Sequence, residues 1–326
     1  MTFCRAWCRV DLAGGTLDLW PLGLLHPNAR TINVAVDIPV SVTLTRRDSG
    51  YEVRQGASAV VVDSVQELAA HPETQLVGVA AEAFQWPPMA VQLESGSPRG
   101  GGLGASSAMM VALLTAGRRF LGQDSLEVSE VAAIARDLEA RLMRLPTGLQ
   151  DHFPTLVGGA LELTYPPGGV SVRQLEVDLG RLGESLLVVY TGQSHFSAGN
   201  NWQILRSHLD GDSSSWAHFD ELSAAAMDVG MALEAGDLEA VGAGMLREWG
   251  ARRQLAPGIS TEPIEELLGL ASEQGAWGGK ACGAGGGGCV AILVPPEDKE
   301  GLARSLESRG YEVLPAQPTA EKFVLA

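Results

Sequence analysis

The sequence predicts an α+β protein built from two domains. Its 326 residues suffice for one large or two ordinary domains, and 45% hydrophobic with 19% charged residues support a sizeable core. Short strand-like segments are mixed with longer segments of helical periodicity, without internal repeats or a low-complexity linker. We expect the first domain to cover residues 1–175 and the second to cover 176–326, because the division falls somewhere near Pro166–Gly183.

The first domain is expected to begin with strands. Thr31–Thr45 alternates apolar and polar residues and is rich in β-branched types, which predicts one long strand or a strand pair. Shorter strands are expected at Tyr51–Val53, Val60–Val62, Ala90–Glu94, Gly158–Thr164 and Val170–Val177. Helices are expected at Val65–Trp86, Ala105–Leu121 and Ser125–Leu142.

The second domain has longer predicted helices. A buried strand is expected at Leu186–Tyr190. Helices should follow at Ser214–Glu234, Asp237–Leu255, Thr261–Gln274 and Asp298–Ser308, with strands at Cys289–Val294 and Tyr311–Val313.

The charge balance excludes one class of function. A formal net charge of −16 argues against a sequence-independent nucleic-acid binder, which needs a basic face. A phosphate ligand stays compatible, because a few backbone N–H groups and one metal ion can hold it. No apolar run is long enough to span a bilayer and the start lacks a signal-peptide core, so we expect a cytoplasmic protein without a membrane partner.

The four cysteines have two interpretations. Cys4 and Cys8 could form half of a zinc site, but no second Cys/His pair of suitable spacing accompanies them. We therefore expect them, with Cys282 and Cys289, to be buried free thiols.

A glycine-rich loop lies between a predicted strand and a predicted apolar helix. It reads Pro98-Arg99-Gly100-Gly101-Gly102-Leu103-Gly104-Ala105-Ser106-Ser107. Glycines let backbone N–H groups approach a phosphate, and the start of a helix adds unpaired donors and a partial positive charge. Ser106 and Ser107 could cap the helix or ligate Mg²⁺. The alternative is an ordinary turn with a serine N-cap. The loop is not a Walker P-loop, since it has no lysine.

Two further motifs stand near the ends of the chain. The first reads Arg9-Val10-Asp11-Leu12-Ala13-Gly14-Gly15-Thr16-Leu17-Asp18, and the second Lys280-Ala281-Cys282-Gly283-Ala284-Gly285-Gly286-Gly287-Gly288-Cys289. The second motif also has the glycine spacing of dinucleotide-binding folds. That fingerprint follows a strand and opens a helix, whereas here we expect a helix before the glycines and a strand after them. We therefore expect no nicotinamide cofactor; a tight helix-to-strand connection is the alternative to a substrate contact.

Together, in order and content, the three motifs resemble those of the GHMP kinases (galactokinase, homoserine kinase, mevalonate kinase and phosphomevalonate kinase). Ala105 is one extra residue between the Gly-Leu-Gly sequence and the serine pair, and this variant of the motif resembles the branch of heptose-phosphate kinases and fucokinases. The resemblance implies a ribosomal S5-like N-terminal domain with a left-handed βαβ unit and a ferredoxin-like C-terminal domain. It implies ATP as the phosphoryl donor, bound by Pro98, Gly100, Gly101, Gly102, Leu103, Gly104, Ala105, Ser106 and Ser107.

The resemblance also implies the catalytic groups. Asp151, in Gly148-Leu149-Gln150-Asp151-His152, matches the family aspartate that faces the acceptor hydroxyl. It would orient or deprotonate that hydroxyl; the alternative is a loop aspartate in a turn hydrogen bond. Arg9 occupies the place of a family cation near the reacting groups, where it could stabilise charge or lower the pKa of Asp151. Otherwise it is a surface cation paired with an acidic neighbour.

Mg²⁺ is expected between Ser106 and Glu139, which the resemblance places at the family's metal position. Two oxygen ligands, completed by ATP phosphates and water, suit this ion. The alternative for Glu139 is an exposed helix face near Arg136 and Arg141.

The acceptor should contact Asp18, whose carboxylate can accept paired hydroxyl donors. The other residues expected to bind substrate are Gly14, Gly15, Gln150, His195, Gly285 and Gly286. Gly15-Thr16-Leu17-Asp18 departs from the heptose-phosphate kinase sequence, which weakens the transfer of that substrate.

These observations predict an ATP-dependent kinase for a hydroxyl of a sugar or sugar phosphate. Two alternatives stay open: a kinase of the same family for a non-sugar alcohol such as homoserine or a mevalonate-type acid, or a non-catalytic ATP-binding sensor. The partner would be a small molecule, and a homodimer is left open.

Overall fold

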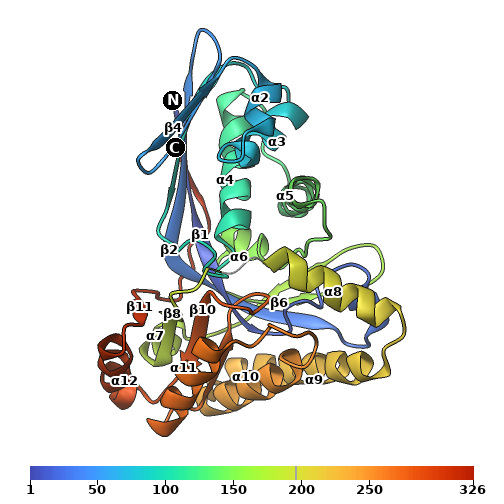
Figure 1. Ribbon diagram of the computed structural model, residues 1–326, viewed down its shortest axis with the longest axis vertical. Coiled ribbons are helices and arrows are strands. Elements are labelled where there is room, and N and C mark those ends of the chain that lie inside the picture. The colour runs from blue at the N-terminus through green and yellow to red at the C-terminus, as the bar shows by residue number, and fades with distance from the viewer. Residues whose placement is uncertain (195–196) are drawn as a thin grey trace.

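The computed structural model describes residues 1–194 and 197–326, which form two β-sheets with helices packed on both. Figure 1 shows the larger sheet and its helices in the upper part, and the smaller sheet with the C-terminal helices in the lower part. The predicted α+β class is confirmed.

The first sheet is built on two long antiparallel strands, β1 (Thr2–Ala13) and β2 (Arg30–Arg46). Its strand order is β12-β1-β2-β5-β3-β4, and β6 joins β2 to β7. The other members are β3 (Tyr51–Gln55), β4 (Ser58–Val62), β5 (Met89–Ser95), β6 (Ala160–Thr164), β7 (Ser171–Gln174) and β12 (Val324–Leu325). The segment predicted as one strand or a pair is therefore one strand, which bonds to β1 along its length and to β5 and β6 on its other edge.

Five helices belong to this sheet: α2 (Val65–Ala70), α3 (Gln75–Ala83), α4 (Ala105–Phe120), α5 (Val128–Met143) and α6 (Phe153–Val157). In Figure 1, α2 to α5 lie to one side of the long strands. The apolar α4 contacts both β1 and β2 and buries nearly all of its side chains from Ser107 to Gly117 in the main core. Burial of this helix fixes its first turn against the middle of β1.

The single helix predicted over Val65–Trp86 is wrong, because the chain breaks after α2. Pro72 disfavours helical backbone at His71, which is extended with ψ 127°. The Thr74 hydroxyl then donates to the carbonyl of Leu68 at 2.7 Å, and α3 restarts at Gln75.

The second sheet contains β8 (Leu186–Tyr190), β9 (Gly278–Ala281), β10 (Cys289–Leu293) and β11 (Glu312–Leu314), in the order β11-β8-β10-β9. With helices after its first and third strands, this is the βαββαβ arrangement of ferredoxin-like domains. The remaining helices are α1 (Leu22–Leu25), α7 (Leu179–Ser185), α8 (Ser197–Leu209), α9 (Ser213–Ala235), α10 (Leu238–Arg252), α11 (Glu262–Glu273) and α12 (Pro296–Ser308).

The two halves are joined by more than one connection. Helix α9 packs on β2, and the C-terminal segment returns to the first sheet, where β12 pairs with β1. A boundary at residue 175 therefore leaves β12, a strand of the first sheet, in the C-terminal part of the chain.

Three strands were not predicted: β1, β9 and the two-residue β12. Strand β1 is buried on both faces while carrying Arg9 and Asp11, so no apolar–polar alternation marks it. Strand β9 includes two glycines and a lysine, residues that are depleted in strands. The helix predicted over Thr261–Gln274 is present as α11, but β9 follows it, so the second glycine run connects two antiparallel strands, β9 and β10, and is not a helix-to-strand connection. No helix opens after it, so the dinucleotide fingerprint still lacks its context.

Candidate active site

The two glycine-rich loops lie in direct backbone contact, although they are far apart in the sequence. The N–H of Cys289 donates to the carbonyl of Gly101 at 2.8 Å. Gly102 has φ 72°, and a Cβ there would lie 2.6 Å from the carbonyl oxygen of Cys282. Only glycine combines this φ with this approach. The contact brings residues from both halves of the chain to one place.

The first loop leads into an uncapped helix. Gly104 is the N-cap of α4 with φ 70° and no side-chain cap, and Ala105 is the first helical residue. The carbonyl of Leu103 accepts the N–H of Arg9 at 2.9 Å, and the carbonyl of Pro98 accepts that of Gly101 at 3.0 Å. The free N–H groups of the first turn are therefore available to an anion.

Arg9 and Asp151 form an ion pair beside this loop. Nε and one terminal nitrogen of Arg9 lie 2.9 and 2.6 Å from Oδ1 of Asp151, and the other terminal nitrogen lies 2.5 Å from the Gly102 carbonyl. The Arg9 side chain is only 3% exposed, whereas that of Asp151 is 29% exposed. Burial opposes the charge on Arg9, but Asp151 and Asp11 more than offset it, so the pKa of Arg9 is raised. The pair presents a partly accessible carboxylate held by a buried cation.

Glu139 lies under the start of α4. Its Oε2 accepts the Ser107 hydroxyl at 3.0 Å and lies 3.1 Å from His152 Nε2, while its Oε1 is buried without a partner. The sequence indicates Ser106 as the partner of Glu139, but the side chain that contacts Glu139 is that of Ser107, and Ser106 is exposed at the helix start. His152 was missed. Burial opposes its charge, but Glu139 outweighs burial and raises the pKa of His152. The Ser107 hydroxyl and the Glu139 carboxylate, whose Oε1 has no partner, supply oxygen atoms that fit a hard cation such as Mg²⁺.

Asp18 and Gln150 form a second polar group. The N–H of Gln150 donates to Asp18 Oδ2 at 3.1 Å, and Oε1 of Gln150 is buried without a partner. Burial raises the pKa of Asp18 to about 6, and the negative charge of Asp151 adds to this rise. Both side chains retain acceptor capacity for hydroxyl donors.

A cavity of about 300 Å³ opens beside Asp18. We call it the Asp18 cavity. Its lining comes from the Leu17–Leu24 segment, the loop before Asp151, Arg136 of α5, and the Tyr165–Val170 turn between β6 and β7. The volume is at the lower end of the range for small-molecule sites.

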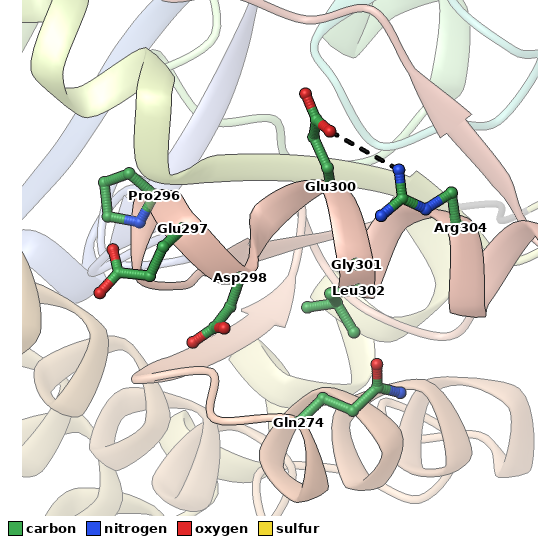
Figure 2. Close-up of a pocket in the computed structure, with 8 residues that line it drawn as sticks. All are labelled: Gln274, Pro296, Glu297, Asp298, Glu300, Gly301, Leu302 and Arg304. Atoms are coloured by element: carbon green, nitrogen blue, oxygen red, sulfur yellow. Dashed lines mark ion pairs between the residues drawn. The ribbon is translucent and has the colours of Figure 1, made fainter.

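A larger cavity of about 530 Å³ lies elsewhere, between α12 and the end of α11. Three carboxylates, Glu297, Asp298 and Glu300, are among its lining residues, and Figure 2 shows Glu300 paired with Arg304. None of the glycine motifs reaches this cavity, and its charge disfavours a phosphate ligand.

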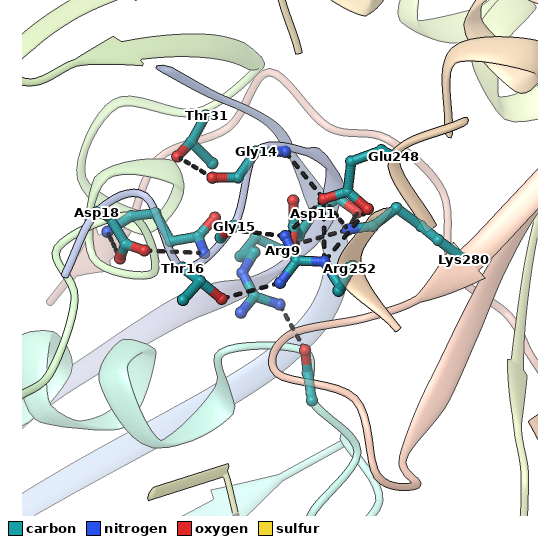
Figure 3. A network of polar contacts seen from close by, with 12 residues as sticks. Arg9, Asp11, Gly14, Gly15, Thr16, Asp18, Thr31, Glu248, Arg252 and Lys280 are labelled. Atoms are coloured by element: carbon teal, nitrogen blue, oxygen red, sulfur yellow. Dashed lines mark hydrogen bonds and ion pairs between the residues drawn. The ribbon is translucent and has the colours of Figure 1, made fainter. Parts of the chain in front are cut away.

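A buried ionic network lies behind the Gly14–Asp18 turn. The Lys280 ammonium donates to Asp11 Oδ2 at 2.9 Å and lies 3.6 Å from Glu248 Oε1, and Glu248 in turn pairs with Arg252. Figure 3 shows Glu248, Arg252 and Lys280 gathered on one side of the turn, opposite Asp18. The sequence did not indicate a role for these four residues. Asp11 could have been found, because it follows Arg9 by two residues on one strand face.

The remaining predicted residues fall in different places. Gly14 and Gly15 lie on the ionic network. The N–H of Gly286 donates to the Ile259 carbonyl at 2.6 Å, and a Cβ on Gly285 would meet that same oxygen at 2.6 Å. These glycines therefore pack on the chain, and Gly286 has no free N–H for a ligand. His195 lies outside the described residues.

The four cysteines are buried free thiols, as predicted. Burial raises the pKa of Cys4 to about 12 and that of Cys282 to about 11. Among the described residues, no cluster of three or more His, Cys, Asp and Glu side chains could hold a metal ion. Within the same residues, no helix is both long and apolar enough to cross a membrane.

Comparison with known proteins identifies the family. Residues 74–159 match the model of the GHMP kinases N terminal domain, and residues 231–312 match that of the GHMP kinases C terminal region. The chain is 24% identical to D-glycero-alpha-D-manno-heptose 7-phosphate kinase of Campylobacter jejuni, over 93% of this chain and 92% of that protein. It is 31% identical to mevalonate kinase of Aeropyrum pernix, over 78% of this chain and 74% of that one.

Among solved structures, galactokinase of Lactococcus lactis complexed with galactose superposes with a TM-score of 0.79 at 12% identity, covering 99% of this chain and 94% of that one. The fold, the order of the three motifs and these matches agree. The chain belongs to the GHMP kinase family.

Proposed function

We propose that this protein transfers the γ-phosphoryl group of ATP to a hydroxyl group of a sugar or sugar phosphate. The observation that carries the proposal is the position of the Arg9–Asp151 pair. The pair adjoins Gly104, the uncapped start of α4, where a Cβ would lie 3.3 Å from Arg9 Cγ and 3.5 Å from Asp151 Cβ. Asp151 also directly follows Gln150, whose N–H donates to Asp18. A phosphoryl donor and a hydroxyl acceptor could therefore meet at Asp151.

The nucleotide side needs donors for phosphate oxygens. The first-turn N–H groups of α4 supply them, and Gly102 and Gly104 let the main chain approach without a Cβ. Ser107 and Glu139, with the exposed Ser106 nearby, would hold Mg²⁺, which neutralises phosphate charge when bound.

The acceptor side needs a group that handles the hydroxyl proton. Asp151 Oδ1 is occupied by Arg9, so Oδ2 would face the hydroxyl and receive its proton as the oxygen bonds to the γ-phosphorus and the bond to the β-phosphate oxygen breaks. Arg9 would stabilise the negative charge of the transferring group.

A sugar suits the acceptor site better than a carboxylic acid. Asp18 and Gln150 Oε1 accept hydrogen bonds from hydroxyls, whereas a substrate carboxylate beside Asp18 and Asp151 would be repelled. One relative, matched over 93% of this chain, is a heptose 7-phosphate kinase. Arg136, the single cation among the described residues that line the Asp18 cavity, could bind the phosphate of such an acceptor.

The test is a screen of sugars, sugar phosphates, homoserine and mevalonate by ADP release with ATP and Mg²⁺. We expect turnover with a sugar or sugar phosphate. The Asp151→Asn variant should bind a non-hydrolysable ATP analogue normally and lose at least about 100-fold in kcat. Turnover of mevalonate or homoserine alone would replace the acceptor class, and near-normal kcat in Asp151→Asn would refute the role of Asp151. Tight ATP binding without ADP formation in the presence of any acceptor tested would favour a non-catalytic ATP-binding sensor.

A further inference from the structure

The Gly14–Asp18 turn has a conformation that its own residues do not favour. Gly14 has φ 80°, and Thr16 has φ 73°. A positive φ is a genuine outlier for a β-branched residue and persists only where the surroundings fix it. The turn carries Asp18, so whatever fixes Thr16 also fixes the acceptor carboxylate.

The groups that fix the turn come from α10, in the other half of the chain. One terminal nitrogen of Arg252 donates to the Thr16 hydroxyl at 2.9 Å, and the other donates to the Gly15 carbonyl at 2.7 Å. The N–H of Gly14 donates to Glu248 Oε1 at 3.1 Å. Three successive residues of the turn are therefore held by two side chains one helical turn apart (Figure 3).

These side chains are deeply buried. Arg252 is 1% exposed and Glu248 is 0% exposed, and the Lys280–Asp11 pair beside them is equally buried. Removing such ions from water costs several kcal/mol per ion. A protein with apolar residues of similar volume in their place is often at least as stable. Stability alone therefore does not explain an arginine here. Its planar fork, which reaches a hydroxyl, a carbonyl and a carboxylate at once, does.

We propose that Arg252, held by Glu248, is a positioning residue that fixes the Gly14–Asp18 turn and so presents Asp18 to the acceptor. The effect on acceptor binding rests on the function proposed above, whereas the contacts that hold the turn do not depend on it. Among the described residues, Arg252 donates its hydrogen bonds to Glu248, Gly15 and Thr16, and to no residue of the glycine loop before α4. Its loss should therefore weaken acceptor binding and leave nucleotide binding intact.

The experiment compares Arg252→Lys and Arg252→Met with Arg253→Met. Arg253 is the next residue, but it is exposed and pairs with Glu265. For each variant, the acceptor KM, kcat and the Kd of a non-hydrolysable ATP analogue are measured. Amide hydrogen exchange of residues 14–19 is followed without substrate.

We expect Arg252→Met to raise the acceptor KM at least about tenfold, the size of one lost charged hydrogen bond, with the nucleotide Kd unchanged. Exchange over residues 14–19 should accelerate. Arg252→Lys should recover part of the loss, and Arg253→Met should behave as the unmodified protein. An unchanged acceptor KM and exchange rate in Arg252→Met would overturn the proposal. So would equal weakening of acceptor and nucleotide, which indicates a general structural role.

If Arg252→Met does not fold, Glu248→Met/Arg252→Met removes the pair together and leaves no unbalanced buried charge; the same acceptor defect is expected. If the unmodified protein phosphorylates no sugar, the proposed function fails, and hydrogen exchange still decides whether Arg252 fixes the turn.

Discussion

The Oδ1 atom of Asp151 accepts hydrogen bonds from two nitrogens of Arg9, at 2.6 and 2.9 Å, while the third nitrogen of the guanidinium donates to the Gly102 carbonyl at 2.5 Å. One buried side chain therefore connects the proposed catalytic carboxylate with the glycine loop. Its position sets the distance between them.

Arg9→Lys should lower kcat at least about tenfold, because one ammonium cannot replace a fork with three contacts. The kcat is measured by coupled ADP release. Arg5→Lys, an exposed arginine on the same strand, is the control and should be neutral. Equal kcat in Arg9→Lys and the unmodified protein would show that positive charge alone suffices.

Ser107→Ala should raise the Mg²⁺ concentration needed for half-maximal activity by about tenfold or more, because a hard cation loses an oxygen ligand. Ser106→Ala should have the smaller effect, since the Ser107 hydroxyl is the one that contacts Glu139. Activity is titrated with Mg²⁺ at fixed ATP. The reverse order of the two variants would restore the pairing inferred from the sequence.

Acceptor binding should weaken in acid. The pKa of Asp18 is raised to about 6, so its carboxylate takes up a proton as the pH falls through that value and accepts fewer hydroxyl donors. The acceptor KM should rise below about pH 6, while the nucleotide Kd stays constant. In Asp18→Asn this acid limb should disappear. If the acceptor KM of Asp18→Asn still rises below about pH 6, the titrating group is not Asp18.

Asp18 should also cost stability when ionised. Its pKa is raised from 3.8 to about 6, so the folded chain binds this proton more tightly than the unfolded chain. The favourable contribution is complete below the unfolded pKa and is lost as the pH rises through about 6; the full shift corresponds to at most about 3 kcal/mol. Asp18→Asn should therefore raise Tm at about pH 8 and have less effect at about pH 4. A lower Tm at the higher pH would contradict this assignment.

Gly102→Ala should destabilise the protein more than Gly122→Ala. The two glycines have φ 72° and 69°, so the backbone strain of alanine is equal. A Cβ at Gly122 meets open space, whereas one at Gly102 meets the Cys282 carbonyl at 2.6 Å. We expect a difference in unfolding free energy of about 1–3 kcal/mol by denaturant titration. Equal effects would mean that the loops separate at little cost.

Much of the fold could be predicted because its signals are local. Thr31–Thr45, Ala105–Leu121 and Cys289–Val294 are apolar or alternating segments, and each forms its predicted element. Strand β1 could not, since Arg9 and Asp11 are buried by ionic contacts to residues far along the chain, Asp151 and Lys280, and only the folded structure brings these together.

The candidate site divides in the same way. Arg9, Asp18 and Asp151 stand in motifs, so the resemblance found them. Arg252 and Glu248 stand in an ordinary helical sequence, and only the packing of α10 on the Gly14–Asp18 turn gives them a role. The choice between Ser106 and Ser107 depends on which side of α4 is buried, which neighbouring serines in a sequence do not reveal.

The contact between the two glycine loops has an evolutionary consequence. A Cβ on Gly283 would lie 3.2 Å from the Gly102 carbonyl, and one on Gly288 would lie 2.9 Å from that of Gly101. When a side chain grows in an ordinary core, a partner can shrink in a later generation to make room. Here glycine faces glycine and main chain, and no smaller residue exists. We expect no compensating substitutions between these positions in descendants of this gene: each glycine must persist on its own, and lineages that lose one should lose the kinase activity with it.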